Sequence, residues 1–282
     1  YPLGLDISRV KEFYDRGARY MSLSHDGHSQ FCASNTGEKD SLWIDKGVSN
    51  LGKQVIEEMN KLGMMIDISH PSKQSIKDMI SLSKAPIIAS HSSARALCNH
   101  SRNLDDEQLE WMKSNGGVVQ TVAFSSYVNS EKHIAYSSAL SKKVENLARE
   151  REMEMKSWDE IRKLEAADRE IYVKQYRVMS KEAAKSMNES DPKPVDVADY
   201  VDHIDYLVEK IGLDHVGISS DFDGGGGIYG WNDASETLNV TAELLKRGYS
   251  EDEISQLWSG NLLRVLDRVE EVAKKLQTKG KV

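Results

Sequence analysis

The sequence contains little cysteine, no long apolar run and no surplus of positive charge. Its two cysteines, Cys32 and Cys98, are too few for the disulfide framework of a small secreted domain. No apolar run approaches the roughly 20 residues that a membrane-spanning helix requires, so we expect no transmembrane segment. The net charge of -8 and the lack of a basic stripe argue against nucleic acid as a partner.

What the sequence does contain is an alternation of short apolar runs and helical patterns. Its 282 residues, 39% apolar and 29% charged, suit a soluble globular protein with room for one large domain. Such an alternation is typical of parallel strands joined by crossover helices, so we expect an α/β fold. Five strands are predicted, at Arg19–Ser24, Met64–Ile68, Pro86–Ala89, Val118–Phe124 and His215–Ser219. Helices are predicted at Leu3–Gly17, Asn50–Leu62, Lys73–Lys84, Val197–Ile211, Leu238–Arg247 and Glu251–Lys275.

Residues 130–194 differ in character from the rest of the chain. They are dense in Lys, Glu and Arg and predict exposed helices, for example Ala139–Arg151 and Ser157–Met187. We interpret them as a charged helical insertion within a single domain of residues 1–282, too charged to form a core of its own. Covering a site, meeting a partner subunit and a purely solvated excursion are all compatible with this composition.

Two histidines stand at matched positions in neighbouring units of the alternation. His70 and His91 each follow an apolar run, and each is preceded by a serine. The carboxyl ends of parallel strands share one face of a sheet, where such folds place their chemistry, so we expect the two imidazoles together. Side by side they would form half of a metal site. The alternative is that each histidine only caps its strand and bonds a backbone carbonyl group.

Further reactive side chains follow the other predicted strands. His25, Tyr127 and Asp221 stand just beyond strand ends, and Arg102 lies eleven residues after His91. Metal-assisted hydrolysis typically uses imidazoles that hold a metal, a carboxylate that takes a proton from water and a guanidinium that clamps a substrate carboxylate. No serine or cysteine nucleophile with a base and an orienting acid is apparent.

These residues lie in stretches that resemble the renal (membrane) dipeptidase family of zinc peptidases, peptidase family M19. The likeness is carried by IDISHPS, APIIASHSSARALCNHSRN, HVGISSDFDG, RYMSLSH and NLLRVLDRVEE, and it covers nearly the whole chain except the charged insertion. It implies a (β/α)8 TIM barrel of the metallo-hydrolase type. It also implies zinc-dependent hydrolysis of dipeptides, including dipeptides with a carboxyl-terminal D-residue.

The resemblance implies roles for the side chains that would meet the substrate. His25 would polarise the scissile carbonyl group, and Asp221 would be the acid and base near the metals; both would be catalytic and would contact the substrate. Arg102 and Tyr127 would bind the carboxylate of the dipeptide.

The resemblance also implies a zinc site and a departure from it. His70 and His91 would be metal ligands of the second of two zinc ions. In the family, a His-x-Asp pair and a bridging glutamate that hold the first ion precede the stretch matching Tyr1, and neither has a counterpart here. A catalytic zinc ion usually has three protein ligands, so we expect one ion or none in this chain. The chain resembles a bacterial-type member that lacks its N-terminal part.

Five predicted strands are too few for the eight of a complete barrel. We therefore expect an incomplete barrel with open edges, corresponding to the carboxyl-terminal two-thirds of the family fold. These 282 residues alone should show little or no dipeptidase turnover. The expected partners are a small dipeptide and either a second copy, as a homodimer, or a complementing N-terminal fragment. A non-catalytic remnant that binds small peptides and another metal-dependent barrel amidohydrolase stay open as alternatives, as do bacterial cytoplasm and periplasm.

Overall fold

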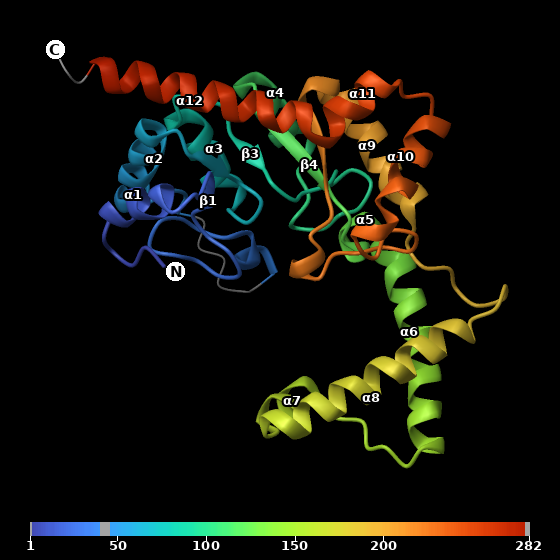
Figure 1. Ribbon diagram of the computed structural model, residues 1–282. Coiled ribbons are helices and arrows are strands. Elements are labelled where there is room, and N and C mark those ends of the chain that lie inside the picture. Colours follow the sequence, from blue (N-terminus) through green and yellow to red (C-terminus); the bar gives the residue numbers. More distant parts are fainter. Residues whose placement is uncertain (1, 40–45, 280–282) are drawn as a thin grey trace. The chain divides into compact units, whose positions relative to one another are not determined.

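The computed structural model describes residues 2–39 and 46–279. They contain a parallel sheet in which each strand pairs with its neighbours in chain order (Figure 1). This α/β architecture is the one that the alternating apolar runs predict. Each predicted strand contains an observed strand, which is shorter. The strands are β1 (Tyr20–Ser22), β2 (Met65–Asp67), β3 (Ile88–Ala89), β4 (Val118–Val122) and β5 (Val216–Ser219).

Helices connect the strands and pack against the sheet. In α2 the sequence sets both limits, because Ser49 accepts from the backbone N–H of Gly52 and Gly63 ends the helix in the left-handed conformation (φ 85°). The helices that belong with the sheet are α1 (Ser8–Asp15), α2 (Asn50–Leu62), α3 (Lys73–Leu82), α4 (Asp106–Asn115), α5 (Ser125–Val128), α9 (Val197–Ile211), α10 (Thr237–Lys246), α11 (Glu251–Ser255) and α12 (Asn261–Lys279). Short 3₁₀ turns are η1 (Asn35–Lys39), η2 (Leu213–His215), η3 (Phe222–Gly224) and η4 (Ala234–Glu236).

The predicted last helix, Glu251–Lys275, is wrong as a single element. A π-helical turn, η5 (Gln256–Gly260), separates α11 from α12. The buried side chain of Asn261 follows this turn and donates to the carbonyl groups of Leu213 (2.7 Å) and Val216 (2.8 Å). The interruption thus allows one helix residue to satisfy two backbone groups at the start of β5.

Helix α12 crosses the amino ends of the strands. Arg264 donates to the carbonyl groups of Gly116 (3.0 Å) and Asp214 (2.7 Å), which precede β4 and β5. The apolar face of α12 packs against residues of β2, β3 and β4, and α12 runs alongside α2 (Figure 1). The opposite, carboxyl ends of the strands are left for the loops that carry the candidate site. The core cluster on the α12 side is formed by Met65, Ala85, Ile88, Val118, Val265 and Val269.

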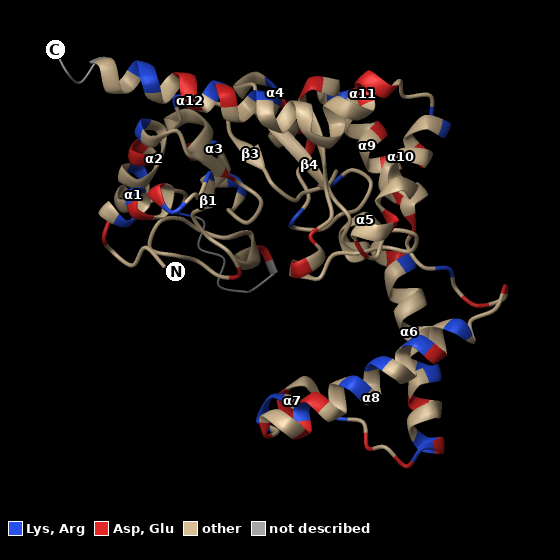
Figure 2. Ribbon diagram, viewed as in Figure 1, with Lys and Arg blue, Asp and Glu red and all other residues tan. Residues whose placement is uncertain are grey.

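The chain divides into two compact units, Tyr1–Asn129 with Asp196–Val282 and, separately, Ser130–Val195. The second unit contains α6 (Ser130–Glu150), α7 (Trp158–Lys163) and α8 (Ala166–Lys185). Lys and Arg residues are interspersed with Asp and Glu residues along these helices (Figure 2). The expectation that this stretch is too charged for a core is nevertheless wrong, because α6 and α8 bury a small one formed by Val144, Ala148, Met179 and Ala183.

The predicted helix Ser157–Met187 is divided in two. Leu164 and Glu165 adopt extended backbone angles (ψ 147° and 151°), so α7 ends and α8 begins anew. Across the described ranges, every helix is too short or too polar to cross a membrane.

Candidate metal centre and substrate site

His70 and His91 lie at the carboxyl ends of two neighbouring inner strands, β2 and β3. Their Nε2 atoms are 3.0 Å apart, and their ring planes are tilted by 59°. Two nitrogen ligands of a tetrahedral zinc ion, with bonds of about 2.0–2.1 Å, lie about 3.3 Å apart. The two imidazoles can therefore share one ion after a shift of a few tenths of an ångström.

Burial favours the neutral, metal-binding form of both imidazoles. His70 is only 3% exposed, and burial, reinforced by Arg102 and two neighbouring histidines, lowers its pKa to about 2. Burial also lowers the pKa of His91, although the carboxylate of Asp67 opposes this effect. Each ring thus keeps a lone pair available at one nitrogen.

His25, which follows β1, lies over the ring of His70. The two ring centroids are 3.9 Å apart and the planes differ by 24°. The carboxylate of Asp26 lies 3.7 Å from Nδ1 of His25 and 3.9 Å from Nδ1 of His70. These three residues could hold a metal through one atom each, all within 4.8 Å of one another. This flank faces solvent, because the side chains of His25 and Asp26 are 66% and 76% exposed.

Arg102 reaches the same end of the sheet from the loop after β3. It is 7% exposed, and its Nε donates to the carbonyl group of Ser69 (2.8 Å). Its Nη1 faces the hydroxyl of Tyr127 at 3.4 Å. Its Nη2 is buried and has no hydrogen-bond partner among residues 2–39 and 46–279. A buried guanidinium with an unused donor is a binding point for a carboxylate group.

Tyr127 lies in α5 and supports this guanidinium. Its ring is stacked between His100 (4.2 Å between centroids) and Phe124 (4.4 Å), and the Arg102 guanidinium carbon lies 5.4 Å from its centroid. Burial raises the pKa of Tyr127, so the phenol keeps its hydrogen and remains a donor. The structure thus brings together Arg102, from the loop after β3, and Tyr127, from α5.

Asp221 follows β5 in the left-handed conformation, with φ 54°. Its carbonyl oxygen accepts from the backbone N–H groups of Gly224 (3.0 Å) and Gly226 (2.7 Å). A Cβ atom at Gly226 would collide with the carbonyl oxygen of Ser220, so a glycine is required for the loop to fold back. Positive φ at a residue other than glycine is uncommon and concentrates at functional sites.

Three residues that connect the strand ends were not predicted as part of the site. Asp67, Ser69 and Ser90 are buried and hydrogen-bonded to one another behind the histidines. Asp67 lies within an apolar run, and the sequence pattern identifies it only as a strand residue. A charged side chain within such a run, and a serine before each histidine, are the signals that could have identified the network.

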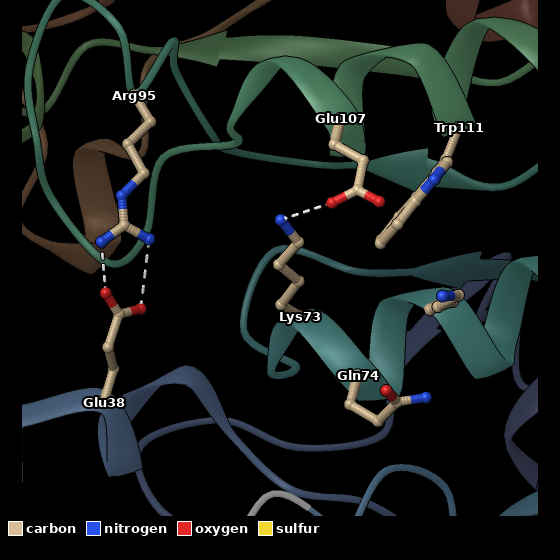
Figure 3. Close-up of a pocket in the computed structure, with 7 residues that line it drawn as sticks. Glu38, Lys73, Gln74, Arg95, Glu107 and Trp111 are labelled. Atoms are coloured by element: carbon tan, nitrogen blue, oxygen red, sulfur yellow. Dashed lines mark hydrogen bonds and ion pairs between the residues drawn. The ribbon is translucent and has the colours of Figure 1, made fainter.

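A larger hollow of about 530 Å³ lies between α3 and α4 (Figure 3). Arg102 lines a separate, small hollow, and Lys73 and Arg95 line both hollows. Figure 3 shows Lys73 paired with Glu107 (2.8 Å) and Arg95 paired with Glu38. These charges neutralise one another, so the candidate centre is the histidine pair rather than this larger hollow.

The residues present fit part of a zinc site. The Nε2 atoms of the two imidazoles lie 3.0 Å apart, and the buried Nδ1 of His70 has no hydrogen-bond partner in the described part of the chain. Imidazole nitrogens are preferred zinc ligands, but a catalytic zinc ion usually takes three protein ligands. The pair therefore accounts for two of them.

The parallel sheet, with imidazoles gathered at the carboxyl ends of its strands, agrees with what the comparisons with known proteins show. The chain belongs to the membrane dipeptidase family (peptidase family M19), whose sequence model matches residues 1–280. Dipeptidase aclJ of Aspergillus oryzae is 30% identical over 277 residues, which are 98% of this chain and 51% of that protein. Dipeptidase verJ of Clonostachys rogersoniana is 32% identical over 272 residues, 96% of this chain and 53% of that protein. The chain thus spans about half the length of these relatives.

Solved structures agree with this family. The probable dipeptidase PvdM of Pseudomonas aeruginosa is 36% identical, with a TM-score of 0.72 over 96% of this chain and 68% of that one. A metallopeptidase of Rhodobacter sphaeroides, solved with a phosphinate mimic of the dipeptide L-Ala-D-Ala, is 21% identical, with a TM-score of 0.65 over 94% of this chain and 60% of that one. The second likeness concerns the fold alone.

Proposed function

We propose that the protein containing this chain is a zinc-dependent dipeptidase that hydrolyses dipeptides, including those with a carboxyl-terminal D-residue. The observation that carries the proposal is the 3.0 Å approach of the two Nε2 atoms of His70 and His91. Membership of the dipeptidase family and the names of the relatives support the reaction class.

In this proposal His70 and His91 hold zinc, and a bound zinc ion acidifies water and polarises a carbonyl group. Asp221 accepts the proton of the attacking water and returns it to the leaving amine. His25, stacked on His70 on the solvent side, donates a hydrogen bond to the scissile carbonyl oxygen. The left-handed backbone of Asp221 supports its role, because such strain persists where function requires it.

The substrate carboxylate would bind Arg102 and Tyr127. The unused Nη2 of Arg102 and the Tyr127 hydroxyl offer two donors from one buried corner. A peptide held here by its terminal carboxylate would present its last peptide bond to the histidines, whatever its length. The preference for a dipeptide therefore rests on the family to which the chain belongs.

The 282 residues alone should turn over dipeptides slowly or not at all, because they contribute two of the three ligands that a catalytic zinc ion usually has. A homodimer or a complementing N-terminal fragment would be needed to complete the site. The test compares this chain, with and without zinc, with a longer protein containing it, on L,L- and L,D-dipeptides, lactones and N-acyl amino acids. We expect zinc-dependent cleavage of dipeptides by the longer protein and not by this chain. Preference for a lactone or an N-acyl amino acid would overturn the proposal.

Replacing Arg102 with lysine tests the carboxylate site. Arg102→Lys keeps the charge but loses the planar fork, so the dipeptide KM of the longer protein should rise about 10- to 100-fold with a smaller change in kcat. The matched control is Arg95→Lys, on the same loop but paired with Glu38, which should change KM less than about twofold. An unchanged KM in Arg102→Lys would remove this residue from the binding site.

A further inference from the structure

A buried carboxylate, Asp67, receives hydrogen bonds from both strand ends of the site. Its Oδ1 accepts from the backbone N–H of Ser69 (3.2 Å), the hydroxyl of Ser69 (2.9 Å) and the backbone N–H of Ser90 (2.9 Å). Its Oδ2 lies 2.9 Å from the hydroxyl of Ser90. The residue is 2% exposed, and no Lys or Arg ion pair to it occurs in the described part of the chain. Its contacts instead lead to a histidine.

The hydroxyl of Ser90 has three possible acceptors. Its Oγ is 2.9 Å from Oδ2 of Asp67, 2.7 Å from Nδ1 of His91 and 3.2 Å from Oγ of Ser69, whose own hydrogen points to Oδ1 of Asp67. A carboxylate oxygen can only accept, so the single hydroxyl hydrogen of Ser90 points to Asp67. The lone pair of Ser90 then faces Nδ1 of His91, which must carry a hydrogen to make the 2.7 Å contact. Nε2 of His91 is left as the acceptor, on the side of His70.

The backbone of His91 is held by the same group. Its N–H donates to the hydroxyl oxygen of Ser69 (2.9 Å), which itself donates to Asp67. One carboxylate thus sets both the ring tautomer and the position of the main chain. His70 has no comparable support, because its Nδ1 lacks a hydrogen-bond partner within the described ranges.

We propose that Asp67, acting through Ser90, is a positioning residue that holds His91 as the Nδ1–H tautomer and presents its Nε2 lone pair to a metal ion. This inference rests on the proposed function in its choice of ligand. The tautomer follows from the hydrogen bonds alone. Partners of this kind behind a metal-binding histidine fix its tautomer and ring orientation, and their loss typically costs about 10- to 100-fold in affinity.

Asp67→Asn reverses the network without changing its shape. Three donors converge on the Oδ1 position, so the amide oxygen of the asparagine occupies it and the amide NH₂ takes the place of Oδ2. The NH₂ group donates to Ser90, and the Ser90 hydrogen turns to Nδ1 of His91. His91 then becomes the Nε2–H tautomer, which cannot bind a metal at that atom. An Asp-to-Asn change that yields the wrong histidine tautomer is known to be costly in serine proteases.

The experiment uses the metal-free 282-residue chain and its zinc complex. Nitrogen-15 NMR of the imidazole rings should show Nδ1–H at His91 in the wild type and Nε2–H in Asp67→Asn. Zinc affinity, measured by competition with a chelating dye, should fall about 10- to 100-fold in Asp67→Asn and in Ser90→Ala. The matched control is Ser92→Ala, on the other side of His91, because the buried Ser92 hydroxyl has no hydrogen-bond partner in the described residues. Its affinity should stay within about twofold of the wild type.

Each outcome decides one of the two claims. Nε2–H at His91 in the wild type, or an unchanged tautomer and zinc affinity in both Asp67→Asn and Ser90→Ala, would overturn the positioning role. If the wild type shows Nδ1–H but binds no zinc, the proposed metal site fails while the assignment of the network stands. If Asp67→Asn does not fold, Ser90→Ala supplies the test, since it removes the hydroxyl that accepts from His91 and should abolish the preference for Nδ1–H.

Discussion

The corner between β2 and β3 differs from the two flanks of the same site. At the corner, His70 and His91 are set among buried groups, and Asp67 connects both strand ends. On the flanks, His25 follows β1 and Asp221 follows β5, which are the outermost strands of the described sheet. An inner strand has a neighbour on each side to hold its end, whereas an outer strand has one. Groups that need fixed geometry therefore lie on inner strands, and the flanks retain freedom to adapt.

This difference predicts where substitutions reduce stability, and the largest loss should occur in the buried part of the loop that follows β3. The buried side chain of Asn103 accepts from the N–H of Ser93 (3.1 Å) and donates to the carbonyl groups of Cys98 (2.9 Å) and Tyr127 (2.8 Å). Asn103→Ala removes three hydrogen bonds in a buried region, so the free energy of unfolding should fall by about 2–4 kcal/mol in urea titrations.

The exposed Asn99 on the same loop provides the control. Its side chain accepts from Nε of Arg95 (2.9 Å) at the surface, so Asn99→Ala should change the free energy of unfolding by less than about 0.5 kcal/mol. Equal losses in the two variants would mean that the loop is no better fixed at its buried end than at its surface.

The second prediction concerns pH. His203 is buried, accepts from the N–H of Ala94 at Nδ1 (3.1 Å) and lies 2.8 Å from the carbonyl oxygen of Val128 at Nε2, and burial lowers its pKa from 6.5. The unfolded chain therefore takes up a proton first as the pH falls below about 6.5. The contribution of neutral His203 to the free energy of unfolding is complete above that pH. Below it, this contribution should decline by about 1.4 kcal/mol per pH unit.

His203→Gln isolates this effect. Urea titrations between pH 7.5 and 5 should give a wild-type slope steeper by about one proton than that of the variant, whatever the stability of the variant at pH 7.5. Parallel slopes would mean that His203 is protonated in the folded protein. The comparison is informative because His203 connects the loop carrying Arg102 to α5, which carries Tyr127.

The sequence predicts the pairing of His70 and His91 at the corner better than it predicts the hydrogen bonds of Asp67 that hold the corner. The matched Ser-His ends of two apolar runs were sufficient to expect His70 and His91 together, because the parallel topology alone decides which strand ends are neighbours. The role of Asp67 was missed because it depends on the distance to Ser90, 23 residues later, which no local pattern contains. The core between α6 and α8 was missed for a similar reason, since its small apolar faces become visible only once the two helices pair.

The smallest expected effect on stability is at Asp221. Asparagine tolerates the left-handed conformation as aspartate does, so Asp221→Asn should change the free energy of unfolding by less than about 0.5 kcal/mol. Asp214→Asn, at an exposed position before the same strand, is the control for loss of one charge. In the longer protein, Asp221→Asn should lower kcat about 10²- to 10⁴-fold if this carboxylate transfers the proton, whereas Asp214→Asn should not. A loss of stability above about 1.5 kcal/mol in Asp221→Asn would show that this flank is as firmly built as the corner.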